Sequence, residues 1–138
     1  VGEWRVNPGG EEGFLGGSDT ITALGEAWII GRLSLNFEGG RVMSSQTTLG
    51  FDEAKGKFVG TWVGDMMSHQ WVYEGELSED ESELRLHCVG PAFDGSGELS
   101  NYCDTIVILN ENERLLRATV QQADGTWHQF METHFTRV

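Results

Sequence analysis

Short runs of alternating apolar and polar residues, separated by turn-forming residues, make up almost the whole chain. Alternation with a period of two is typical of strands that bury one face, and Gly, Asn, Asp and Pro between the runs mark tight connections. The pattern predicts ten strands, at Gly2 to Val6, Ser18 to Leu24, Glu26 to Phe37, Val42 to Phe51, Lys57 to Met66, His69 to Leu77, Glu83 to Val89, Leu99 to Leu109, Arg114 to Gln121, and Thr126 to Arg137.

The short connections predict that successive strands are antiparallel neighbours. The chain has 19 Gly, and it is rich in Thr, Val, Trp and Phe, so long helices are not expected. Ten strands in 138 residues avoid exposed edges best by closing on themselves. We therefore predict an all-β fold, a single antiparallel up-and-down barrel that spans residues 1–138 as one domain.

The hairpin around Met67 and Ser68 gives the most detailed prediction. If these two residues form the turn, Met66 pairs with His69 and Trp62 pairs with Tyr73. One face then gathers apolar and aromatic side chains, and this face is predicted to point inward. The predicted ligand-binding residues on it are Phe58, Trp62, Met66, His69, Trp71, Tyr73 and Leu77.

Three glycines alternate with the aromatic residues on this inward face, at Gly60, Gly64 and Gly75. Because Gly has no side chain to fill space, the pattern fits either a tightly packed core or a hollow that holds a small ligand. The sequence leaves both readings open.

The dipeptide Asp124-Gly125 is a strong signal for a type I′ turn in the last hairpin. Centring the turn there predicts that Arg117 lies opposite Glu132, Ala118 opposite Met131, and Val120 opposite Gln129. Arg117 and Glu132 are then expected to form an exposed ion pair that contributes less than about 1 kcal/mol.

The two cysteines, Cys88 and Cys103, are too few for a disulfide scaffold and lack the spacing of a structural zinc site. Two unlinked, partly buried thiols are the simpler interpretation. A symmetric loop between their strands would instead place the cysteines opposite each other, within reach of a disulfide.

The formal charge of −13 argues against nucleic acid and anionic membranes as partners, since both require clustered Lys and Arg. No run approaches the roughly 18 apolar residues of a membrane-spanning helix. With 38% hydrophobic residues, the chain carries too much apolar surface to be an acidic disordered segment. A cytoplasmic protein is expected.

Catalytic and cofactor motifs are missing from the sequence, so no cofactor is predicted and enzymatic activity is left undecided. His69 is the one candidate for chemistry, because the predicted pairing turns it inward at the rim. An imidazole there could hydrogen-bond a ligand, hold a metal or haem iron, or act as the base of an isomerase or hydrolase. His87, His128 and His134 are expected on the surface or rim.

Gly2-Glu3-Trp4 resembles the Gly-x-Trp element that opens the first strand of lipocalin-like (calycin) barrels. Other stretches closely resemble the signature of a bacterial family catalogued as domain of unknown function 1579. They are Thr48 to Asp52, Gly60 to Val63, Met66 to Gly75, Gly90-Pro91-x-Phe93-Asp94, Asp124-Gly125-x-Trp127, and Phe130-Met131-Glu132-x-His134-Phe135. The resemblance implies a lipocalin-like fold in which Arg137 packs over Trp4, and it implies no particular activity.

Together these observations predict a lipocalin-like barrel that binds a small apolar or amphipathic molecule inside. The alternatives are an enzyme that uses His69 at the barrel mouth, a haem or metal carrier through His69, and a packed interaction module that dimerises through an exposed strand.

Overall fold

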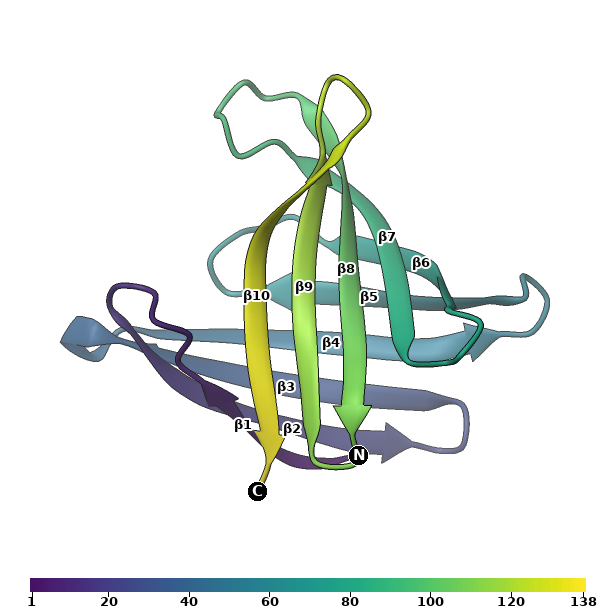
Figure 1. The fold of residues 1–138 in the computed structure, drawn as a ribbon, viewed down its shortest axis with the longest axis horizontal. Coiled ribbons are helices and arrows are strands. Elements are labelled where there is room, and N and C mark those ends of the chain that lie inside the picture. The colour runs from purple at the N-terminus through teal and green to yellow at the C-terminus, as the bar shows by residue number, and fades with distance from the viewer.

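The chain forms a closed barrel of ten antiparallel strands in a computed structural model that describes residues 1–138 (Figure 1). The strands are β1 (Gly2–Asn7), β2 (Phe14–Leu24), β3 (Trp28–Phe37), β4 (Val42–Asp52), β5 (Lys57–Gly64), β6 (Trp71–Leu77), β7 (Glu83–Pro91), β8 (Leu99–Asn110), β9 (Glu113–Gln121) and β10 (Trp127–Arg137). Each strand pairs with the next along the chain, and pairing of β1 with β10 closes the barrel. All ten predicted strands and the predicted all-β class are confirmed.

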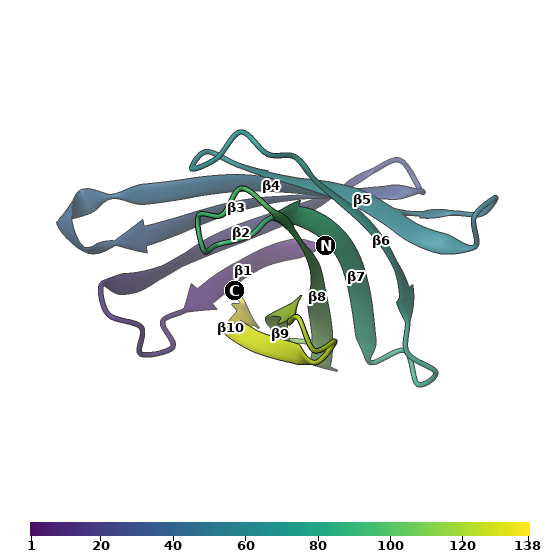
Figure 2. The ribbon, with the colours of Figure 1, turned by 90° about the horizontal axis from the view of Figure 1, so that it is seen from above.

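Two layers of strands cross within this barrel. Figure 1 shows β2 to β5 running across the direction of β8 to β10, and Figure 2 shows β6 and β7 curving from one layer to the other. Helical structure is limited to one three-residue 3-10 turn, Glu38–Gly40, which is far too short to cross a bilayer.

The predicted register of the central hairpin is wrong by two residues. Trp62 pairs with Trp71, and Phe58 pairs with Gly75, whereas a turn at Met67-Ser68 would have paired Trp62 with Tyr73. The strands end at Gly64 and begin again at Trp71, so a six-residue connection replaces the predicted two-residue turn. Met67 and Ser68 lack the Gly or Asn that a primed turn favours, and the connection opens. The shift is an even number of residues, so the side chains of the paired residues keep their predicted faces, whereas His69, in the connection, does not face inward as predicted.

In the last hairpin the ion pair is confirmed, whereas the predicted type I′ turn and one pairing are wrong. A type I′ turn needs a positive φ at both central residues, and Asp124 does not have one; residues 122–126 connect β9 and β10 instead. Arg117 lies opposite Glu132, with Nε 2.8 Å from Oε2, and Ala118 lies opposite Met131. A β-bulge at Phe130 then shifts the register, so Gln129 pairs with Thr119 instead of Val120. An extra residue in one strand changes the face of everything beyond it.

The inward glycines allow strands to approach one another closely. A Cβ atom added at Gly60 would lie 2.1 Å from the carbonyl oxygen of Thr48, and one at Gly75 would lie 1.8 Å from that of Arg85. These glycines therefore let the backbone bend and pack where any side chain would collide with the next strand. They do not by themselves leave a hollow.

Candidate functional site

A cavity of about 340 Å³ lies inside the barrel. Twenty-two of its 28 lining residues are hydrophobic. They include members of both hydrophobic clusters of the interior, one around Trp71, Tyr73 and Leu86 and the other around Val6 and Phe135. The volume falls within the range of small-molecule sites, so the interior is partly hollow and not fully packed.

The exposed residues among those lining the cavity mark where it opens. Met66, from the β5–β6 connection, is 47% exposed, and Phe93, from the β7–β8 connection, is 65% exposed. Phe130 and Met131 in β10 are also exposed, and the bulge at Phe130 explains why two consecutive side chains both reach the cavity. We call these four residues the mouth. Figure 1 shows the β7–β8 and β9–β10 connections rising side by side at the top of the barrel.

Four of the seven residues predicted to bind ligand line the cavity: Trp62, Met66, Trp71 and Tyr73. Phe58 packs against the cluster around Trp71 without lining the cavity. Leu77 is 41% exposed at the far end of β6 and does not line it either.

His69 lies outside the cavity, and no histidine lines it. Its Nε2 atom is 3.1 Å from the carbonyl oxygen of Val89, and its ring packs edge-on against Trp71 with the centroids 4.7 Å apart. The pairing of β6 with β7 stops at Glu74 and His87, so the imidazole bridges the two strands beyond their last paired residues. His69 lies instead in a second hollow, which it shares with His87 and Trp127, so the alternatives that use it for haem binding or catalysis do not involve the interior cavity.

Trp71 is held in place from several sides. Its Nε1 atom donates a hydrogen bond to Sδ of Met67 at 3.1 Å, and its ring packs edge-on against Tyr102. A Cβ atom at Gly90 would lie 2.1 Å from this ring, so the indole occupies the space that a side chain at Gly90 would fill. The wall beside the mouth therefore depends on a glycine on the neighbouring strand.

A carboxyl group stands in the middle of the apolar wall. Asp104 in β8 lines the cavity, and its Oδ2 accepts a hydrogen bond of 2.5 Å from the hydroxyl of Tyr73 in β6. Burial raises the pKa of Asp104, and the hydrogen bond from Tyr73 opposes the rise. Burial and the nearby carboxyl also raise the pKa of Tyr73, so the phenol stays protonated. We call Asp104 and Tyr73 the wall pair.

A second carboxyl group lies at the closed end of the barrel. Asp19 in β2 accepts a hydrogen bond of 2.6 Å from Arg114 in β9, and both side chains are buried. The guanidinium group of Arg114 stacks over the rings of Trp4 and Phe135, at 4.8 and 3.9 Å from their centroids. These four residues and Arg137 form what we call the floor.

Arg137 packs over Trp4 with its guanidinium carbon 4.4 Å from the ring centroid, which confirms the predicted contact. Burial lowers the pKa of Arg114, and Asp19 opposes that effect by its opposite charge. The floor thus closes one end of the barrel with stacked rings and a compensated charge pair.

Neither carboxyl group was singled out by the sequence analysis, although a signal was present. Asp104 falls in phase with Tyr102 and Ile106 in β8, and Asp19 falls in phase with Ile21 in β2. A charged residue at an inward position of a strand is the pattern that would have identified both.

The two cysteines are free, so the interpretation of two unlinked thiols is confirmed and the alternative disulfide is wrong. Cys88 pairs with Tyr102, and Cys103 pairs with His87, one position away from the register that a disulfide needed. Cys88 therefore faces the cavity, where burial raises its thiol pKa to about 12.

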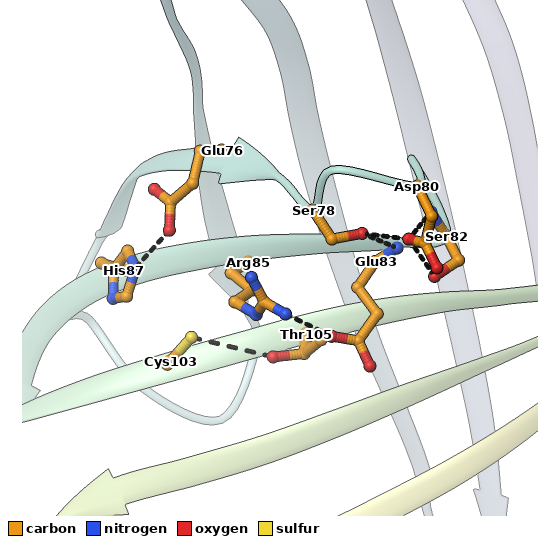
Figure 3. A network of polar contacts seen from close by, with 9 residues as sticks. All are labelled: Glu76, Ser78, Asp80, Ser82, Glu83, Arg85, His87, Cys103 and Thr105. Atoms are coloured by element: carbon orange, nitrogen blue, oxygen red, sulfur yellow. Dashed lines mark hydrogen bonds and ion pairs between the residues drawn. The ribbon is translucent and has the colours of Figure 1, made fainter.

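The outer surface of β6, β7 and β8 carries its own polar contacts (Figure 3). His87 lies there, with Nε2 3.1 Å from Oε1 of Glu76, and Sγ of Cys103 lies 3.7 Å from Oγ1 of Thr105. These groups point away from the cavity, and nowhere in the structure do three or more His, Cys, Asp or Glu side chains gather as metal ligands would.

Comparison with known proteins identifies one family. A family model described as "Protein of unknown function (DUF1579)" matches residues 1–137. A search of curated proteins gives no match.

Proposed function

The chain belongs to the DUF1579 family of proteins of unknown function, and we propose that it is a lipocalin-like barrel that binds a small apolar or amphipathic molecule in its interior. The observation that carries the proposal is the cavity of about 340 Å³, whose lining is mainly hydrophobic. Burying apolar surface in a preformed hollow is the usual basis of small-molecule binding.

The shape of the site supports binding over simple packing. The floor closes one end, while the exposed side chains of the mouth reach solvent at the other. A molecule entering at the mouth would pass Trp71 and Trp62 before it reaches the wall pair. At about 30 Å³ for each water-sized group, the cavity holds roughly eleven such groups. This is the size of a short-chain lipid or a small aromatic compound.

Trp62→Ala tests the proposal directly. Trp62 lines the cavity and is only partly buried, so its removal should weaken binding while the barrel still folds. We expect at least about a tenfold loss of affinity for an apolar fluorescent probe, which equals about 1.4 kcal/mol. Trp127→Ala is the matched control, because Trp127 is 46% exposed, does not line the cavity, and should leave binding unchanged.

If the wild-type protein takes up no apolar probe and Trp62→Ala unfolds the barrel, the interior is a core and the proposal is wrong. Native mass spectrometry of protein isolated directly from its host complements this test, since a copurifying small molecule would identify the ligand.

We also propose that the protein works in the cytoplasm. Two free, buried thiols suit a reducing compartment, and the charge of −13 favours solubility.

A further inference from the structure

The charges that line the cavity do not balance. Its one cationic residue is Arg114, which is already bonded to Asp19 at 2.6 Å. Asp104 has no Lys, Arg or His within ion-pairing distance, and its only hydrogen-bond donor is the neutral hydroxyl of Tyr73. The ionised cavity therefore carries one carboxylate without a cation.

The second oxygen of this carboxyl group is free. Oδ2 is taken by Tyr73, but no protein donor bonds Oδ1. Three buried side-chain atoms have no hydrogen-bond partner and no contact with solvent, and they belong to Trp4, Ser45 and Arg114. Oδ1 is not one of them, so it is not sealed from solvent. Since Asp104 lines the hollow and Oδ1 is not sealed from solvent, we infer that Oδ1 can be reached from the space that a ligand would occupy.

The surroundings of Asp104 offer no cation, and the nearby thiol of Cys88 is only a weak donor that makes no hydrogen bond to it. Its partners across β7 and β9 are Leu86 and Ala118, and Ile106 follows it on the inward face. A carboxylate in apolar surroundings is costly unless it is hydrogen-bonded and its charge is compensated. A ligand that supplies a donor, and above all a positive charge, would meet both needs.

Building on the proposed function, we propose that the ligand is an amphipathic amine or alcohol whose donor group bonds Oδ1 of Asp104, and that Asp104 selects such head groups against carboxylates. An ammonium or hydroxyl group donates to this oxygen, whereas a fatty-acid carboxylate has no proton to donate and would be repelled. Tyr73 positions Asp104 by holding Oδ2.

Three compounds with the same tail test this selection: decylamine, decanol and decanoate. Each has about eleven to twelve non-hydrogen atoms, close to the capacity of the cavity. Isothermal titration calorimetry on the full chain, below the micelle concentration of each compound, measures the three affinities. We expect decylamine to bind at least about tenfold more tightly than decanoate, with decanol between them.

Asp104→Asn assigns the selection to one residue. Asparagine keeps a similar shape and can still accept from Tyr73, but it loses the charge. We expect the variant to bind decylamine at least about tenfold more weakly and decanol within about threefold of the wild type. Glu76→Gln removes a carboxylate on the outer surface of β6 and should leave the order of affinities unchanged.

The outcomes separate the two proposals. If none of the three compounds binds the wild type, the cavity function fails and this inference fails with it. If all three bind with equal affinity, or decanoate binds most tightly, the cavity function stands and the role of Asp104 is overturned. The wild-type series decides this even if Asp104→Asn does not fold. An order of affinities that persists in folded Asp104→Asn would also overturn the assignment to Asp104.

Discussion

The floor and the wall pair each place an aspartate inside the barrel, but the two aspartates have different partners. Asp19 has a cation at 2.6 Å and stacked rings around that cation, whereas Asp104 has only a neutral hydroxyl at 2.5 Å and open space on its other side. In the first arrangement the carboxylate is paired with a cation that the protein itself supplies. The second leaves an acceptor unused, and this contrast distinguishes a structural buried charge from one that is available to a ligand.

The largest effect should follow from breaking the floor. Arg114→Met leaves the buried carboxylate of Asp19 without its partner, and we expect the free energy of unfolding to fall by about 3 to 5 kcal/mol. Urea denaturation near neutral pH measures the change. The double variant Asp19→Leu with Arg114→Met removes both charges and should recover most of the loss. A single-variant loss below about 1 kcal/mol would show that the floor does not depend on this pair.

A smaller loss of folding stability is expected for a substitution beside the mouth. Gly90→Ala places a Cβ atom 2.1 Å from the ring of Trp71, so the ring has to move, at a cost of about 1 to 3 kcal/mol. The unfolding temperature and the affinity for an apolar probe should both fall. Gly31→Ala is the control for stability alone, because its nearest contacts would be ordinary ones at 3.5 and 3.7 Å but it lines the cavity. An equal fall in the unfolding temperature of the two variants would contradict the packing of Trp71 over Gly90.

The stability of the wild type should change with pH in a way that the stability of Asp104→Asn does not. Because the folded pKa of Asp104 is raised above the ordinary value of 3.8, the folded state holds its proton to higher pH than the unfolded state does. Its contribution to stability is therefore present at low pH and is lost as pH rises through the folded pKa.

Relative to Asp104→Asn, the wild type should lose at most about 1.4 kcal/mol per pH unit above roughly pH 4, up to that folded pKa. Urea denaturation of both proteins across this range measures the difference, in which the other titrating groups cancel. A difference that stays constant with pH would mean that burial does not perturb Asp104.

The smallest effect is expected at the ion pair on the outside of the barrel. Arg117 and Glu132 meet at 2.8 Å, but both side chains are more than a third exposed. A double-mutant cycle with alanine should give a coupling of less than about 1 kcal/mol, and added salt should reduce it further. A coupling as large as that of the floor pair would undermine the distinction between buried and exposed charges.

The sequence predicted the strands well because alternation and turn residues are local signals. The register of β5 with β6 was wrong because no residue in the β5–β6 connection fixes its length, although the even shift preserved which side chains of the paired residues face inward. The bulge at Phe130 left no mark in the local pattern. The wall pair joins residues 31 positions apart on β6 and β8, and only the pairing of both strands with β7 brings them together.

All four methionines of the chain line the cavity: Met43, Met66, Met67 and Met131. A thioether chain is unbranched, has three rotatable bonds and adapts its shape easily, whereas stacked rings around an ion pair do not. Two of the four methionines, Met66 and Met131, belong to the mouth, so a guest molecule would meet a rigid floor at one end and adaptable side chains at the other. Such a container discriminates by head group and length while tolerating varied outlines in the tail.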